Sequence, residues 1–555
     1  MRCGSTPNRP GSALTPPARR GILKTMSSHN STAPARRVRT RFAPSPTGFL
    51  HVGAFRTALF SYLFARRFGG DFILRIEDTD QARLVKNSLA DIITSMQALG
   101  IGYDEGPDKA TVAALDAEKY GTVDPAILPD HSGNYGPYFQ SQRLPRYLEL
   151  LHQLLEEGKA YYAFETKDEL DRMRKAAEIR KEPFRYSGKY RDYPLGEARD
   201  RVAQGEAAVI RFKMPTEGTI RTVDALRGET LWDAKTQDDF VILKGDGFPP
   251  YHFSSMADDH DMEISHIFRS EEWISSTPKH FCIFEAFGWE LPIFIHTPNV
   301  LGNDRKKLSK RTGASPIRGV IYLPNGEPVI GLLDQGYLED AVFNYLSITG
   351  WSAGDDTEIM TRDEIISRFN IDGISPSPAL FDRDKLAWLN GTYIRRLAPD
   401  ELVERALPFL TKAGLLPAEP TSEERAYAAS VIVLEQERLK TLDEIPALTD
   451  FFFPLLPEYS EKSVGKWLKG AGVSEYLSEV AAALAALPNW NTEEIEATTR
   501  SVGEKQGREK GDLTHPIRVA VTGREVGPSL FDALAVMGRK RALARLHHAQ
   551  EIVLG

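Results

Sequence analysis

The chain has 555 residues, of which 41% are hydrophobic and 26% charged, a composition typical of a soluble globular protein with several domains. Its net charge of −8 argues against a surface that is basic throughout, although it permits a local basic face. No apolar run approaches the roughly 20 residues that a membrane-spanning helix needs. Two cysteines, Cys3 and Cys282, are too few for a disulfide framework or a thiolate metal site, so a reducing compartment is expected.

The first 37 residues predict a disordered lead, because they are rich in Ser, Thr and Pro. Residues 1–70 contain no Asp or Glu, and the first 40 contain eight Arg or Lys. Such a start resembles an organellar transit peptide. The alternative that we favour is a start codon placed too early, with Met26 as the initiator. We therefore expect a cytoplasmic protein, with the mitochondrial matrix as the alternative if residues 1–37 are a transit peptide.

The first ordered elements predict a parallel βαβ unit. Val38–Ala43 alternates like a strand, residues 51–68 have helical apolar spacing, and Gly69-Gly70 ends that helix. Residues 72–76 then form a second, buried strand. In α/β folds of this kind, phosphate binds at the N-terminus of the first helix.

An α/β insertion is predicted from about residue 140 to 245. It contains an amphipathic helix at Arg143–Lys159 and a strand at Ala208–Met214. Residues 239–244 and Pro250–Ser254 are expected to resume the first domain.

Strand signals fade after about residue 390, and helices dominate the last third. Tyr476, Val480, Leu484 and Leu487 fall on one helical face that Pro488 ends. A second apolar face, near the end of the chain, consists of Leu530, Leu534 and Met537.

Two short strings carry the candidate chemistry, HVGA at 51–54 and KLSKR at 307–311. His51 at a helix start can donate to a phosphate oxygen, and Gly53 lets a nucleotide approach the backbone closely. Lys307 and Lys310 are suited to pyrophosphate oxygens because each ammonium is a point charge on a flexible stem. Taken singly, each string is more often a helix start or a solvated charged turn.

Further strings, which occur along the chain in a fixed order with these two, make a shared catalytic role the better interpretation. With them, the chain resembles glutamyl-tRNA synthetases of the bacterial and organellar type from about Arg39 to its C-terminus, and HVGA and KLSKR correspond to the HIGH and KMSKS motifs of such enzymes. The strings are RFAPSPTG (41–48), LRIEDTD (74–80), GPYFQSQR (136–143), PPYHFSSMADDH (249–260), IFRSEEWISSTPKH (267–280) and HPIRVAVTGREVGPSLFDALAVMG (515–538).

The resemblance implies a Rossmann-like, parallel-sheet α/β catalytic domain with an α/β insertion, followed by an all-α anticodon-binding region. The implied boundaries are a lead at 1–37, catalytic halves at 38–117 and 246–304, an acceptor-binding insertion at 118–245, the KLSKR loop with a stem-contact region at 305–390, and the helical region at 391–555.

The resemblance also implies the site residues. His51, Gly53, Lys307 and Lys310 would bind ATP. For glutamate, the matching positions are Arg41, Ala43, Ser45, Glu77, Tyr251, Ser255 and Arg269. Arg41 aligns with the arginine that pairs with the side-chain carboxylate, Arg269 would pair with either carboxylate of glutamate, and Glu77 would take the ammonium group.

The implied activity is that of a glutamate–tRNA ligase that uses ATP with Mg²⁺ and acylates the 2′-OH of the terminal adenosine of tRNA(Glu). Charging of tRNA(Gln) as well, a glutaminyl-tRNA synthetase and an inactive RNA-binding paralogue are the alternatives. We expect a monomer with no membrane association.

Three features depart from the family pattern. Ser255 stands where the family commonly has an asparagine, which puts one polar wall of the pocket in doubt. The insertion lacks the cysteines of the zinc knuckle found in some relatives, so no structural zinc is expected. Two stretches, 107–134 and 320–336, exceed the usual loop lengths.

Overall fold

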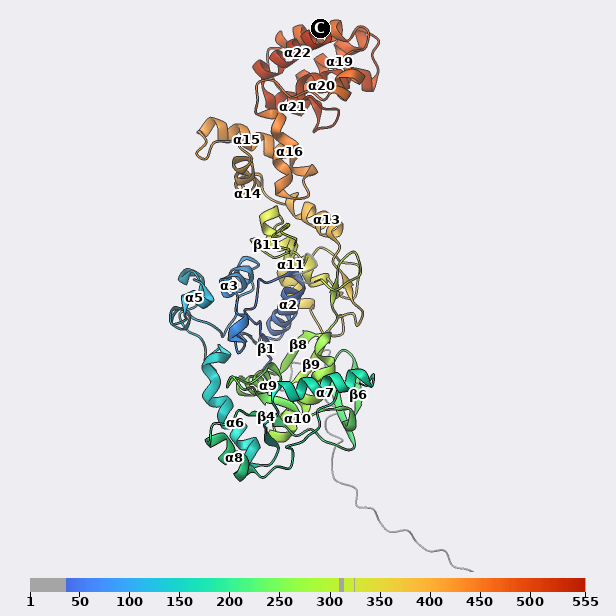
Figure 1. Cartoon of the computed structure of the whole chain (residues 1–555). Helices are drawn as coiled ribbons and strands as arrows, with labels where there is room; N and C mark the ends of the chain where they lie inside the picture. Colours follow the sequence, from blue (N-terminus) through green and yellow to red (C-terminus); the bar gives the residue numbers. More distant parts are fainter. Residues whose placement is uncertain (1–35, 183, 309–313, 324, 555) are drawn as a thin grey trace, which may run out of the picture.

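The computed structural model of the chain describes residues 36–554 apart from 183, 309–313 and 324. Figure 1 shows an elongated arrangement, with the α/β insertion at one end, a parallel sheet in the middle and a helical region at the other end. The predicted fold class is therefore confirmed. Within the described ranges, no helix is both long and apolar enough to cross a membrane.

A parallel sheet forms the centre of the catalytic part. Strand β1 (Arg39–Phe42) pairs in parallel with β2 (Asp71–Leu74), and helix α2 (Val52–Arg67) connects them. The glycine pair ends this helix because Gly69 takes a left-handed conformation, with φ +61°. Gly70 is needed for close approach to β1, since a Cβ there would lie 2.1 Å from the carbonyl oxygen of Val38. The βαβ unit expected from the sequence is present, with element ends shifted by one or two residues.

A second sheet of the catalytic part, in the order β6-β5-β9-β8, comes from residues much later in the chain. Strand β8 (His266–Ser270) lies beside β1, joined by a 2.9 Å hydrogen bond from the Ser265 amide to the Arg39 carbonyl. Strand β9 (Ile293–Thr297) pairs in parallel with β8 and places His296 opposite Arg269. Helices α9 (Tyr251–Asp261) and α10 (Thr277–Phe287) pack together beside this sheet.

A hairpin extends the same sheet. Strand β5 (Thr219–Asp224) pairs in parallel with β9 through Asp224 and Phe294, and it forms an antiparallel hairpin with β6 (Gly228–Asp233). This hairpin lies within the range expected for the insertion, yet it completes the edge of the catalytic sheet.

The insertion has its own antiparallel sheet in the order β3-β4-β7. Its strands are β3 (Ala160–Ala163), β4 (Val209–Phe212) and β7 (Phe240–Leu243), and its helices are α6 (Leu144–Glu156), α7 (Lys167–Ile179) and α8 (Leu195–Ala203). Because β7 pairs with β4, residues 239–244 belong to this sheet and do not resume the first domain as expected.

The two extra stretches differ in their packing. Residues 107–134 include α4 (Lys109–Ala113) and α5 (Ala117–Tyr120), and they bury Tyr120, Val123 and Leu128 in the catalytic core. The Tyr120 hydroxyl donates to the carboxylate of Asp78. Residues 320–336 instead form a small hairpin of β11 (Val320–Tyr322) and β12 (Pro328–Ile330), with Tyr322 largely exposed.

Helices connect the sheet to the helical end. They are α11 (Glu339–Ile348), α12 (Arg362–Arg368) and α13 (Arg383–Ile394), with the short strands β10 (Val300–Leu301) and β13 (Ala379–Leu380) pairing in parallel. Helix α3 (Ser88–Ala98) packs against α5 in the catalytic part.

The helical end has the apolar faces that the sequence predicts. Tyr476, Val480 and Leu484 on α18 (Val473–Ala485) are buried in its core, as are Leu530, Leu534 and Met537 on α21 (Leu530–Met537). Its helices are α14 (Pro399–Lys412), α15 (Ser422–Glu435), α16 (Ile445–Thr449), α17 (Glu461–Trp467), α18 (Val473–Ala485), α19 (Thr492–Lys505), α20 (Lys510–Thr522), α21 (Leu530–Met537) and α22 (Arg539–Leu554).

One arginine ties the end of this region together. Arg545 on α22 is fully buried and donates to four backbone carbonyls, those of Phe451, Pro454, Leu455 and Val521. Burial lowers the pKa of its guanidinium to about 10.

Candidate active site

The two short strings meet at the start of α2. The Val52 amide donates to the carbonyl of Ser315, 3.2 Å away. A methyl group added at Gly53 would lie 3.3 Å from the His51 ring and 4.0 Å from the carbonyl oxygen of Leu308, which belongs to KLSKR. Gly53 therefore sits where a side chain would crowd the imidazole and make ordinary van der Waals contact with the basic loop.

The basic loop is only partly described. Lys307 is half-exposed and forms an ion pair with Glu272, in the 3-10 turn that follows β8. Lys310, the other predicted ATP-binding lysine, lies outside the described residues.

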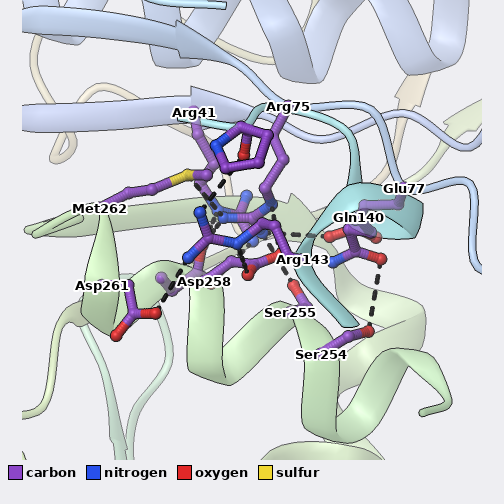
Figure 2. Close-up of polar contacts among 12 residues, drawn as sticks. Arg41, Arg75, Glu77, Gln140, Arg143, Ser254, Ser255, Asp258, Asp261 and Met262 are labelled. Atoms are coloured by element: carbon purple, nitrogen blue, oxygen red, sulfur yellow. Dashed lines mark hydrogen bonds and ion pairs between the residues drawn. The ribbon is translucent and has the colours of Figure 1, made fainter. Parts of the chain in front are cut away.

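A buried network of arginines and carboxylates joins β1 to α9 (Figure 2). Arg41 on β1 makes a two-fold contact with the carboxylate of Asp259, at 3.0 and 3.3 Å. Arg75, which is fully buried, donates to Asp259 at 2.8 Å, to Glu77 at 3.0 Å and to the hydroxyl of Ser255 at 3.0 Å. Three predicted residues, Arg41, Glu77 and Ser255, thus share one network.

Asp258 anchors the same network to the insertion. Its carboxylate accepts hydrogen bonds from Gln140, Arg143 and Tyr147, at 2.6 to 2.9 Å, and all four side chains are buried. Burial raises the pKa of Asp258. Burial acts in the same direction on Asp259, but Arg41 and Arg75 outweigh it and lower the pKa of that carboxyl. The network holds α9 against β1 and the start of α6.

Arg269 has a different environment from Arg41 and Arg75. Its guanidinium donates to His296 at 2.8 Å, to His280 at 2.8 Å and to the hydroxyl of Thr277 at 3.3 Å. Among the described residues, no carboxylate lies within 4.0 Å of it, although its side chain is only 4% exposed. Burial lowers the pKa of Arg269, whereas the Tyr251 phenol and, less strongly, the carboxylate of Asp259 act in the opposite direction. A buried cation without an anion favours a ligand that carries one.

Comparison with known proteins places this arrangement in a family. Residues 37–388 match the tRNA synthetases class I (E and Q), catalytic domain, and residues 401–550 match an anticodon binding domain. The chain belongs to the class I tRNA synthetases of the glutamate and glutamine type.

Relatives of this synthetase carry the name glutamate–tRNA ligase. That of Roseiflexus castenholzii is 42% identical over 523 residues, which cover 93% of this chain and 96% of the relative. That of Chloroflexus aurantiacus is 43% identical over 520 residues, 92% and 96% of the two chains. The crystal structure of a glutamate tRNA ligase from Elizabethkingia meningosepticum, in complex with its amino acid, is 33% identical with a TM-score of 0.82, and covers 93% of the synthetase and 100% of that chain.

The other residues of the synthetase predicted to contact glutamate follow β1 or β2 or begin α9, the elements that carry the buried network. Tyr251 begins α9 and stacks on Trp273 with ring centroids 4.1 Å apart. Ala43, half-buried, and Ser45, exposed, follow β1 in the turn that leads to α2. Burial raises the pKa of Glu77, opposed by Arg75 and Arg41.

Ser255, at the position where the sequence resemblance leads us to expect an asparagine, takes part in the buried network. It is fully buried on α9, and its hydroxyl accepts the hydrogen bond from Arg75. The oxygen thus belongs to the ion-pair network. Sequence reasoning named Ser255 but missed Arg75, Asp258 and Asp259, although all three lie inside strings that carried the resemblance.

Proposed function

We propose that the synthetase activates L-glutamate with ATP and transfers the glutamyl group to the 3′-terminal adenosine of tRNA(Glu). In the first step, the α-carboxylate oxygen attacks the α-phosphorus of ATP, and the bond to the β-phosphate oxygen breaks, which gives glutamyl-adenylate and pyrophosphate. In the second step, the ribose 2′-OH attacks the acyl carbon, and AMP leaves. The observation that carries the choice of glutamate is Arg269, a buried cation whose contacts in the described chain are all neutral.

The phosphate side of the proposed reaction uses the start of α2 and the basic loop. His51 and Gly53 offer an imidazole and an open backbone at a helix N-terminus, where phosphate is favoured. Lys307 and Lys310 would stabilise charge on the departing pyrophosphate. Mg²⁺, when bound with ATP, neutralises phosphate oxygens; it commonly keeps several waters and needs few protein ligands.

The amino-acid side uses the arginines unequally. Arg269 is available to a carboxylate, whereas Asp259 already balances the charge of Arg41. We therefore assign the side-chain carboxylate of glutamate mainly to Arg269, with Arg41 as a second, supporting cation. Tyr251, Ala43 and Ser45 would close the pocket around it, and Glu77 would take the ammonium group. Ser255 would support the polar wall through its hydrogen bond with Arg75.

The tRNA partner is supported by the anticodon binding domain at residues 401–550.

We keep the proposed boundaries at 117, 245, 304 and 390 as approximate limits of the acceptor-binding and stem-contact parts. The monomeric state, the cytoplasmic location and the absence of a structural zinc stay predictions; gel filtration with light scattering and metal analysis test the first and the last.

Charging assays test this function directly. Purified tRNA(Glu) and tRNA(Gln) are each incubated with the enzyme, ATP and labelled glutamate or glutamine. We expect glutamate on tRNA(Glu) and no glutamine on either tRNA. Glutamate on tRNA(Gln) would identify a form that accepts both tRNAs. Glutaminylation, or no charging at all, would contradict the proposal.

A further inference from the structure

Two buried histidines hold Arg269. Its Nε donates to His296 Nε2 and its Nη1 to His280 Nδ1, both at 2.8 Å. The two imidazoles are 1% and 0% exposed. A ring nitrogen accepts a hydrogen bond only when it carries no proton, and a guanidinium has no lone pair to offer. The two nitrogens that face Arg269 are therefore both unprotonated.

The far side of each ring fixes where its proton sits. His296 Nδ1 lies 2.7 Å from the carboxylate of Asp224, which only accepts, so Nδ1 carries the proton. Asp224 is itself held, because its other oxygen accepts from two backbone amides of the following turn. His280 Nε2 lies 3.1 Å from Nδ1 of His252 and donates to it. One tautomer of each ring thus satisfies every contact.

Both rings are held neutral. A second proton on His280 would point at the guanidinium, and burial together with Arg269 keeps the pKa of His280 well below its ordinary value. Burial also lowers the pKa of His296, and it lowers that of His252 to about 4. The contrast with Arg41 is direct, because Asp259 orients Arg41 and also neutralises it.

We propose that His280 and His296 are specificity-determining positioning residues, which orient Arg269 through neutral lone pairs and so leave its charge for the carboxylate of the substrate. This inference rests on the proposed activation of glutamate. Glutamine is nearly isosteric with glutamate, so pocket size separates them poorly. A buried cation without an anion separates them by charge, because glutamine leaves it unpaired.

A pair of substitutions that differ only in charge tests the inference. His280→Gln keeps an acceptor for Arg269 and a donor for His252, whereas His280→Glu places a carboxylate beside Arg269. We expect KM for glutamate in ATP–pyrophosphate exchange with tRNA to rise less than about fivefold in the first variant and more than about 100-fold in the second. In the second, constants for glutamine should change less than about fivefold. Exchange of the exposed His131 for Gln and Glu gives the matched control.

Thermal melting and KM for ATP show whether His280→Glu is folded. If it is not, a second variant tests the positioning role of the histidines. Asp224→Asn keeps an oxygen for the backbone amides of Leu226 and Arg227. Its NH2 group replaces the oxygen that accepts from both the ring and the backbone amide of His296, which favours the other tautomer and turns a proton toward Arg269. We expect about a tenfold higher KM for glutamate with kcat within about threefold of wild type.

Three results separate the possible failures. Equal effects of His280→Gln and His280→Glu on KM for glutamate would overturn the inference, because a merely structural role predicts no dependence on charge. An unchanged KM in Asp224→Asn would overturn it as well. If the wild-type enzyme shows no glutamate-dependent exchange with tRNA present, the proposed function fails instead.

Discussion

Replacing Arg269 with glutamine removes the one described cation of the pocket that is buried and lacks a carboxylate partner. The variant keeps an amide that can still donate to a neighbouring imidazole. Removing one partner of a buried, hydrogen-bonded charge pair costs about 2–5 kcal/mol of binding free energy. At 1.4 kcal/mol per tenfold, KM for glutamate should rise about 30- to 4,000-fold.

The assay is ATP–pyrophosphate exchange in the presence of tRNA, with glutamate and glutamine varied separately. Arg41→Gln gives the comparison, because Asp259 keeps Arg75 as a partner when Arg41 is removed. We expect this second variant to weaken glutamate binding less but to lower the free energy of unfolding by about 3 kcal/mol, near the lower end for a broken buried ion pair. A glutamate KM within threefold of wild type in Arg269→Gln, or equal losses for both amino acids, would refute the reasoning.

Three further substitutions probe other parts of the synthetase. Gly53→Ala puts a methyl group 3.3 Å from the imidazole at the helix start, so KM for ATP should rise about tenfold with an almost unchanged melting temperature. Lys307→Ala breaks an exposed ion pair with Glu272, so the free energy of unfolding in urea should change by less than about 1 kcal/mol. The rate of glutamate activation should fall about 100-fold. An activation rate equal to that of the wild type would argue against a phosphate role for Lys307. Tyr120→Phe removes the hydroxyl bonded to Asp78 and should lower the free energy of unfolding by about 1.5–3 kcal/mol in urea titrations.

The local elements followed from the sequence because their signals are local. Apolar spacing and a glycine pair were enough for α2, and alternation was enough for β1. Residues 239–244 were expected to resume the first domain because Phe240–Leu243 is an unbroken apolar run that suits a buried strand of either sheet, and the choice rests on pairing with β4. The single parallel contact between Asp224 and Phe294 leaves no trace in the sequence at all.

The sequence predicted those site residues whose type has few common roles when it is buried, such as arginine. Arg41 and Arg269 were named from matching strings, but their unequal charge balance depends on Asp259, which sequence reasoning passed over. His280 and His296 were missed for another reason. A histidine in an apolar stretch has many roles, and only the distances to Arg269 and the burial of both rings restrict them.

Arg545 has a consequence for the order in which the helical region is completed during synthesis. The carbonyls that it contacts at Phe451 and Leu455 leave the ribosome some ninety residues earlier. Since domains fold as units when their last required segment emerges, these carbonyls have to rely on water or on temporary partners until α22 is made. The tRNA-binding end of a nascent chain is thus incomplete while its catalytic end is already able to fold.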